Sequence, residues 1–130
     1  MTQNHFHFGD NEPLCEVLLA LGCAGKKTAT CDSLAFYEQG GDQLPEPGRR
    51  DIVTHWDGTP ALEIETTQVT LCAFDEVTEA FALAEGENDD LAGWRRDHEA
   101  YFRRTGAFSP RMTLVCERFR VTRDLTKETE

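Results

Sequence analysis

A long stretch of alternating side chains, placed directly after a tight-turn signal, constrains the fold of this chain most strongly. Asp57-Gly58 is a dipeptide typical of two-residue β-hairpin turns. In the segment 61–74 that follows, leucine and isoleucine share one face of an extended strand and glutamates share the other. A shorter apolar segment over 52–56 precedes the turn. The pattern predicts an antiparallel sheet that buries one of its faces.

Two helices with one apolar face each are expected to pack on this sheet, at 11–24 and 90–105, because apolar residues recur there at helical spacing after capping side chains. The fold class is therefore α+β, a small curled and mostly antiparallel β-barrel with flanking helices. The remaining expected elements are a strand starting at 28–31, a short helix through Tyr37, a helix capped by Asp75 and a strand over 112–121.

The length of 130 residues suits one domain, which we place at 10–122 between a loose N-terminal segment (1–9) and a charged C-terminal one (123–130). No apolar run approaches 18 residues, and the first residues lack the pattern of a secretory signal. The five cysteines are odd in number and form no CxxC pair. These features predict a soluble cytoplasmic protein with reduced thiols and no membrane contact.

Charge is distributed unevenly along the chain. The net charge is −11, which argues against long non-specific contacts with nucleic-acid backbones. The segment 95–123 nevertheless carries eight arginines and a net charge of +5. The arginines either form a local anion-binding face or pair with carboxylates on an ordinary surface, and the sequence leaves both readings open.

A short motif carries the clearest functional signal. Gly25-Lys26-Lys27-Thr28-Ala29-Thr30 resembles the GxKxxT signature of the ASCH domain family, a branch of the PUA-like superfamily. The resemblance covers about residues 8 to 122. Further matches follow in the order expected of bacterial ASCH proteins: Pro47-Gly48 before a strand, Glu63-Ile64-Glu65-Thr66-Thr67, Ala84-Glu85-Gly86-Glu87, Trp94 with His98, and Phe108-Ser109-Pro110 leading to Val115-Cys116-Glu117-Arg118-Phe119.

This resemblance implies a small β-barrel with a cleft for a nucleoside or a short RNA segment, and it implies no cofactor and no metal. Two activities are associated with bacterial members. For hydrolysis of the acetyl amide of N4-acetylcytidine, the family's catalytic group corresponds to Lys27, Thr30 and Glu87. For ribonuclease cleavage, the candidates are Lys27 and Ser109. A non-catalytic RNA-binding module acting through its arginines is the third possibility.

The chemistry of these residues limits their roles. A threonine hydroxyl is a weak nucleophile that needs a base, and lysine is a base only where burial lowers its pKa. A carboxylate beside Lys27 would instead keep it charged, so that it stabilises an oxyanion or binds phosphate, or Glu87 itself carries the proton. Residues i and i+3 face opposite sides of a strand, so Lys27 and Thr30 can cooperate only if the chain bends between them. Otherwise both lysines are solvated and Thr30 is an ordinary strand residue.

Adjacent lysines point to opposite sides of an extended segment, and the resemblance selects Lys27, not Lys26, as the residue in the cleft. We expect its removal to leave the fold intact. Glu117 alternates with apolar residues and therefore faces the apolar side, where it is either structural or part of the cleft. The residues assigned to substrate contact are Lys26, Tyr37, Trp94, His98, Ser109 and Arg118. Trp94 and His98 share an apolar helix stripe, so they either form a core pair or, with Tyr37, stack on a base.

Overall fold

The computed structural model describes residues 4–39, 44–106 and 108–127. Five strands form one sheet in the order β1-β3-β4-β5-β2. Their bounds are β1 (His5–Phe6), β2 (Ala29–Ser33), β3 (Arg50–Thr54), β4 (Pro60–Ala73) and β5 (Thr113–Asp124). The pairing of β1 with β3 is parallel and the other three pairings are antiparallel. The expected α+β class and the mostly antiparallel sheet are therefore confirmed.

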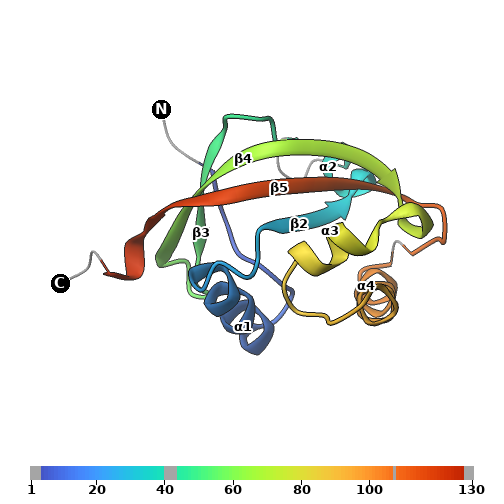
Figure 1. Cartoon of the computed structure of the whole chain (residues 1–130), viewed down its shortest axis with the longest axis horizontal. Helices are drawn as coiled ribbons and strands as arrows, with labels where there is room; N and C mark the ends of the chain where they lie inside the picture. Colours follow the sequence, from blue (N-terminus) through green and yellow to red (C-terminus); the bar gives the residue numbers. More distant parts are fainter. Residues whose placement is uncertain (1–3, 40–43, 107, 128–130) are drawn as a thin grey trace.

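The sheet is open, so the expected barrel is not found. Its two edges are β1 and β2, which have two and five residues and do not pair with each other. The long strands β4 and β5 arch over the helices α1, α3 and α4 (Figure 1). Register shifts at Glu63/Ile64 and Thr66/Gln68 interrupt their ladder. Such bulges bend and twist a strand pair, which curls the sheet without closing it.

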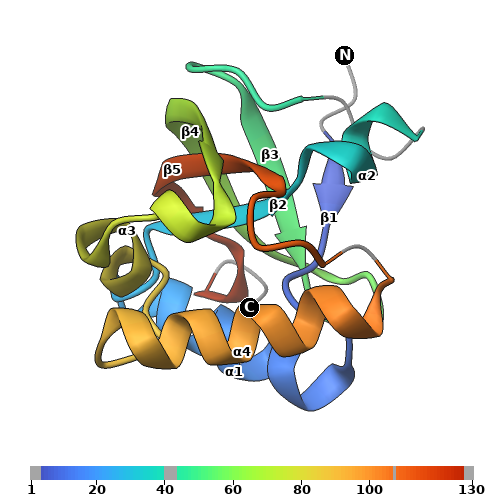
Figure 2. The same cartoon turned by 90° about the vertical axis from the view of Figure 1, so that its right-hand side faces the viewer.

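The helices are α1 (Glu12–Cys23), α2 (Leu34–Glu38), α3 (Glu79–Ala84) and α4 (Leu91–Arg104). The expectations for 11–24 and 90–105 are confirmed, with α4 extending below the sheet (Figure 2). Asp90 caps α4 by accepting a bond from the Gly93 amide at 2.8 Å. The expected capping role of Asp75 is wrong. That residue lies in a single 3-10 turn, and Thr78 caps α3 instead, because its Oγ1 accepts from the Phe81 amide at 3.2 Å.

The N-terminal segment contributes to the fold from Asn4 onward, which corrects the expectation of a loose stretch over 1–9. His5–Phe6 form β1 beside β3, and Phe8 is 3% exposed and stacks on Phe119 with ring centroids 6.1 Å apart. Burial of these aromatic rings is the force that holds the segment in place. At the other end β5 continues to Asp124, beyond the expected domain limit at 122. Residues 1–3 and 128–130 lie outside the described part.

Two apolar clusters form the core, one between α1 and the sheet around Leu62 and Phe119, the other beneath α3 and α4 around Phe74 and Trp94. Several polar residues are buried as well, and three of them carry the site described below: Lys27, Glu85 and Glu117. Among the residues that the structure describes, none of the helices combines the length and the apolar character needed to cross a membrane.

Candidate functional site

A cavity of about 380 Å³ lies between the sheet, α2 and α4. It brings together five of the residues that the sequence assigns to catalysis or substrate contact. These are Lys27, Thr30, Tyr37, Glu87 and His98. Ligand pockets of proteins have volumes of about 300–1,000 Å³, so the cavity is at the small end of that range.

The two adjacent lysines point in opposite directions, as their spacing predicts. Lys26 is exposed, whereas Lys27 is only 2% exposed and lines the cavity. The Thr28 amide donates to the Ala84 carbonyl at 2.7 Å, and the Thr28 carbonyl accepts from the Phe119 amide of β5 at 3.0 Å just before β2 begins at Ala29. Lys27 and Thr30 both line the cavity, and their cooperation stays a prediction.

The Lys27 ammonium has three acceptors, two of them on Glu85. Its Nζ donates to the Ala29 carbonyl at 2.8 Å, to Glu85 Oε1 at 3.3 Å and to the Glu85 carbonyl at 3.4 Å. It also lies 5.0 Å from the centre of the Phe8 ring. The two contacts with Glu85 are long, so a ligand oxygen in the cavity can compete for them.

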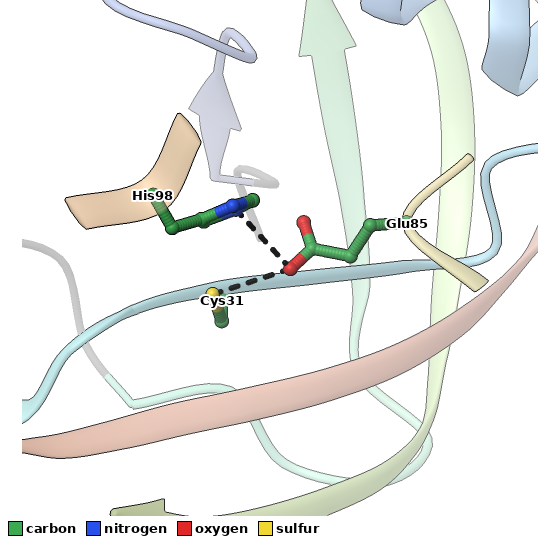
Figure 3. Close-up of side chains that lie close together, drawn as sticks. All are labelled: Cys31, Glu85 and His98. Carbon is green, nitrogen blue, oxygen red and sulfur yellow. Dashed lines mark hydrogen bonds and ion pairs between the residues drawn. The ribbon is translucent and has the colours of Figure 1, made fainter. Parts of the chain in front are cut away.

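Glu85 is the centre of the polar cluster, and sequence reasoning missed it. The side chain is 3% exposed. Its Oε2 accepts from Trp94 Nε1 at 2.9 Å. The same oxygen accepts from Cys31 Sγ at 3.3 Å and lies 3.4 Å from His98 Nε2 (Figure 3). Burial by itself would raise the pKa of Glu85, but the Lys27 charge and the bonds from His98 and Trp94 outweigh it and lower the pKa to about 2. Glu85 is an ionised internal anchor.

Two signals in the sequence point to Glu85. It is the C-cap of α3 and lies four residues after Phe81, which is buried, so the two side chains lie on the same side of the helix end. It also precedes Gly86, whose φ of +93° suits glycine, and a Cβ there would lie 2.9 Å from the Lys26 carbonyl oxygen. This close approach docks the loop after α3 against Lys26 and Lys27, which carries Glu85 to the Lys27 ammonium.

Glu87 differs from Glu85 in its electrostatic environment. It is half-buried and lines the cavity. Burial raises its pKa, although the charges of Lys27 and His98 act in the opposite direction. A carboxyl group with a raised pKa can exchange protons closer to neutral pH than an ordinary glutamate. The role of Glu87 as a proton carrier stays a prediction, while Glu85 is paired with Lys27.

Trp94 and His98 form the core pair, which corrects the assignment of Trp94 to base stacking. Trp94 is fully buried, and the His98 ring stacks on it with centroids 4.1 Å apart. His98 Nδ1 lies 2.9 Å from the Trp94 carbonyl and Nε2 faces Glu85. Burial opposes a charge on His98, but the hydrogen bond to Glu85 and its negative charge outweigh burial and raise the pKa of His98. Tyr37 lines the cavity and is the aromatic candidate that remains.

Three of the expected contact residues lie away from this cavity. Lys26 and Ser109 are exposed. Arg118 lines a separate pocket of about 200 Å³, where its guanidinium lies 5.5 Å from the centre of the Phe81 ring. The candidate pair Lys27 and Ser109 is therefore not assembled around the 380 Å³ cavity.

The arginines of the segment 95–123 are largely engaged with carboxylates. Arg104, the one of the eight that lines the cavity, donates through Nε and Nη2 to Asp10 at 3.1 and 3.2 Å. The ion pairs of this segment are Arg96–Asp97, Arg103–Glu99, Arg104–Asp10, Arg111–Asp75 and Arg120–Glu65. This arrangement matches the second of the two readings left open by the sequence.

The cluster at Glu85 also contains a possible set of metal ligands. Atoms of Cys31, Glu85 and His98 lie within 4.8 Å of one another. The chemistry of the set is unfavourable to a cation, because the Lys27 ammonium lies 3.3 Å from the same carboxylate. Burial and the Glu85 charge also raise the pKa of the Cys31 thiol well above its ordinary value, and a thiol must lose its proton to bind a metal.

Comparisons with known proteins agree with this architecture. The family model for the ASCH domain matches residues 4–123. The crystal structure of an ASCH domain from Lactobacillus crispatus JV V101 is similar, with a TM-score of 0.82 and 36% identity over 92% of this chain and 80% of that one. A protein from Enterococcus faecalis V583 gives a TM-score of 0.87 and 34% identity over 98% of this chain and 81% of that one. A search of curated proteins finds no match. This chain therefore belongs to the ASCH domain family.

Proposed function

We propose that this protein is a metal-independent hydrolase that removes the acyl group from an N-acylated, cytidine-type nucleoside, with Lys27, Thr30 and Glu87 as the catalytic residues. The observation that carries the proposal is their placement. All three line the same cavity, which is of small-molecule size, although they come from the segment before β2, from β2 and from the loop after α3.

The environments of the three residues suggest their roles. The Lys27 ammonium lines the cavity beside Glu85, so Lys27 supplies a positive charge to the oxygen of a tetrahedral intermediate. The raised pKa of Glu87 suits a group that takes the Thr30 proton as the hydroxyl attacks the acyl carbon. Glu87 then gives that proton to the leaving nitrogen. Water hydrolyses the acyl-threonine, which releases the carboxylic acid and restores the hydroxyl.

The placement of Ser109 favours this reaction over ribonuclease cleavage. Its side chain is exposed and does not line the cavity that contains Lys27. The arginines that would hold an RNA backbone are mostly paired with the protein's own carboxylates. Binding of RNA without cleavage is the outcome that would favour a non-catalytic module.

The proposal is tested by comparing two isosteric substitutions in one loop. Glu87 lines the cavity and Asp89 is exposed two residues later. We expect Glu87→Gln to lower the kcat for N4-acetylcytidine by about 10²–10⁴-fold, the usual contribution of a proton-transfer group. Asp89→Asn should keep the wild-type kcat. Acetate release measures both, and equal rates for Glu87→Gln and wild type would exclude the proposed role of Glu87.

A further inference from the structure

One of the buried carboxyl groups that line the cavity has no role in the proposed acyl transfer. Glu117 lies in the middle of β5, lines the cavity and is 6% exposed. Thr66 Oγ1 donates to its Oε2 at 2.6 Å. Within the described residues, the other oxygen, Oε1, has no hydrogen-bond partner. Oε1 is not among the fully buried side-chain atoms that lack a partner, so it is accessible from the cavity and can bond to water or to a ligand there.

The nearby cations are committed to other carboxylates. Arg49 contacts Asp51 Oδ2 through Nε and Nη2, both at 3.0 Å, and Lys27 is paired with Glu85. Within the part of the chain that the structure describes, Glu117 has no ion-pair partner. Burial raises the pKa of Glu117 and the charge of Asp51 adds to the shift, although the bond from Thr66 and the charges of Arg49 and Lys27 act in the opposite direction. A carboxyl group in this environment retains its proton more readily than an exposed one and can donate a hydrogen bond.

The sheet register places this group beside the proposed nucleophile. Glu117 of β5 is directly opposite Thr30 of β2. Side chains at opposed positions of antiparallel strands lie on the same face, with Cβ atoms about 4.5–5.5 Å apart. A ligand whose acyl carbon sits at Thr30 therefore presents to Glu117 the ring atoms next to its amide nitrogen.

We propose that Glu117 is a ligand-binding residue, whose Oε1 forms a hydrogen bond with the heterocyclic base held in this cavity. Thr66 fixes the orientation of the carboxyl group by bonding to its other oxygen. The assignment rests on the proposed function, because it takes the bound base to be that of the acylated nucleoside. It makes Glu117 a determinant of affinity for the base and gives it no part in acyl transfer.

The test is calorimetric binding of cytidine, the deacylated product, because binding of a product does not depend on turnover. Glu117→Leu removes the carboxyl group, and Glu117→Gln keeps both an acceptor for Thr66 and a donor. The matched control is Glu63→Leu. Glu63 is a strand glutamate of the same 6% exposure that also accepts from a threonine, Thr122, at 2.8 Å, but it does not line the cavity.

We expect Glu117→Leu to raise the Kd for cytidine by about tenfold or more, the usual effect of losing a buried hydrogen bond to a ligand. Glu117→Gln and Glu63→Leu should stay within about threefold of wild type. Equal losses in Glu117→Leu and Glu63→Leu would overturn the assignment, as would a Glu117→Gln protein that binds as poorly as Glu117→Leu. Acetate release by wild type with unchanged binding in Glu117→Leu would refute this inference alone. If wild type neither binds cytidine nor deacylates acetylcytidine, both proposals fail.

Discussion

At the scale of single residues, the site depends on two buried charges that hold each other. Lys27 and Glu85 are almost completely buried and lie 3.3 Å apart. Breaking a buried pair by removing one partner is costly, because the other charge remains without compensation. This burial argues against the expectation that loss of Lys27 leaves the fold intact. Its Nζ is bound to protein acceptors and is not held free in a cleft.

Substitution of Lys27 should accordingly affect stability as well as activity. We expect Lys27→Met to lower the free energy of unfolding by about 3–5 kcal/mol, because it leaves the buried Glu85 carboxylate without a compensating charge. Lys26→Met, next to it and exposed, should leave stability nearly unchanged. The double variant Lys27→Met/Glu85→Gln should recover part of the loss. Urea unfolding measures all three, and a stable Lys27→Met protein would show that the pair is not buried as described.

The lowered pKa of Glu85 predicts a loss of stability in acid. A folded-state value of about 2, against an ordinary value of 4.5, contributes stability that is complete above 4.5 and is lost as pH falls toward 2. The shift is worth on the order of 3 kcal/mol. Glu85→Gln should be less stable at neutral pH and should lose less on acidification. Melting temperatures between about pH 5 and pH 3 measure the difference, and parallel profiles for the two proteins would contradict it.

The sequence predicts part of this site and not its centre. The direction of Lys27 follows from strand alternation, and the places of Thr30 and Glu87 in the cavity agree with the motif resemblance. Spacing from Phe81 and the glycine that follows point to Glu85, but its contacts with Lys27, Trp94 and His98 depend on the folded arrangement and not on local pattern.

At the scale of elements, the loop after α3 determines where the site forms. It docks against the segment before β2 through the Thr28 amide and the Ala84 carbonyl. Gly86 makes the approach possible, since any Cβ there would meet the Lys26 carbonyl oxygen. The loop delivers both Glu85 and Glu87, so a displacement of the loop should affect the anchor and the proton carrier together.

Two glycines with nearly the same φ allow the cost of the backbone conformation to be distinguished from the cost of the close approach. Gly86 and Gly58 have φ values of +93° and +92°, but a Cβ at Gly58 would meet no atom within 4 Å. Gly58→Ala should cost about 1–2 kcal/mol, the ordinary penalty for a left-handed residue. Gly86→Ala should cost more and also reduce acetate release. Denaturant unfolding and the activity assay provide the comparison, and equal effects of the two substitutions would contradict tight docking of the loop.

The local sequence pattern predicts most helices and strands, but it does not predict whether the sheet closes into a barrel. Apolar spacing and caps specify α1 and α4, and the alternation after Asp57-Gly58 specifies β4. The cap of α3 was misplaced because Asp75 and Thr78, three residues apart, are both suitable capping residues before the same helix. Whether the edge strands β1 and β2 pair with each other and close the sheet depends on contacts between residues far apart in the chain. No local sequence signal encodes such contacts.

At the scale of the whole molecule, an acidic protein contains a small cavity, and most arginines of the segment 95–123 form ion pairs with the protein's own carboxylates. The net charge is −11, and the ion pairs of the segment 95–123 leave few guanidinium groups for an external polyanion. The uneven charge along the chain is visible in the sequence. Which charged residues pair with each other depends on the fold. Arg104, for example, pairs with Asp10, 94 residues away in the sequence.

This distribution predicts weak RNA binding with a small dependence on salt. We expect the affinity for a labelled single-stranded RNA to change much less than the roughly 10³–10⁵-fold that a protein with six to ten phosphate contacts shows between about 50 and 200 mM salt. Fluorescence anisotropy at the two salt concentrations measures it. A steep dependence would indicate an extended phosphate-binding face and would favour an RNA-binding module.

The central claim is that the cavity serves a small acylated nucleoside. The most direct measurement incubates the wild-type protein with N4-acetylcytidine and a labelled RNA in the same sample, with a chelator present, and follows acetate release and strand cleavage together. The account predicts acetate release with intact RNA. Cleaved RNA without acetate release would contradict it.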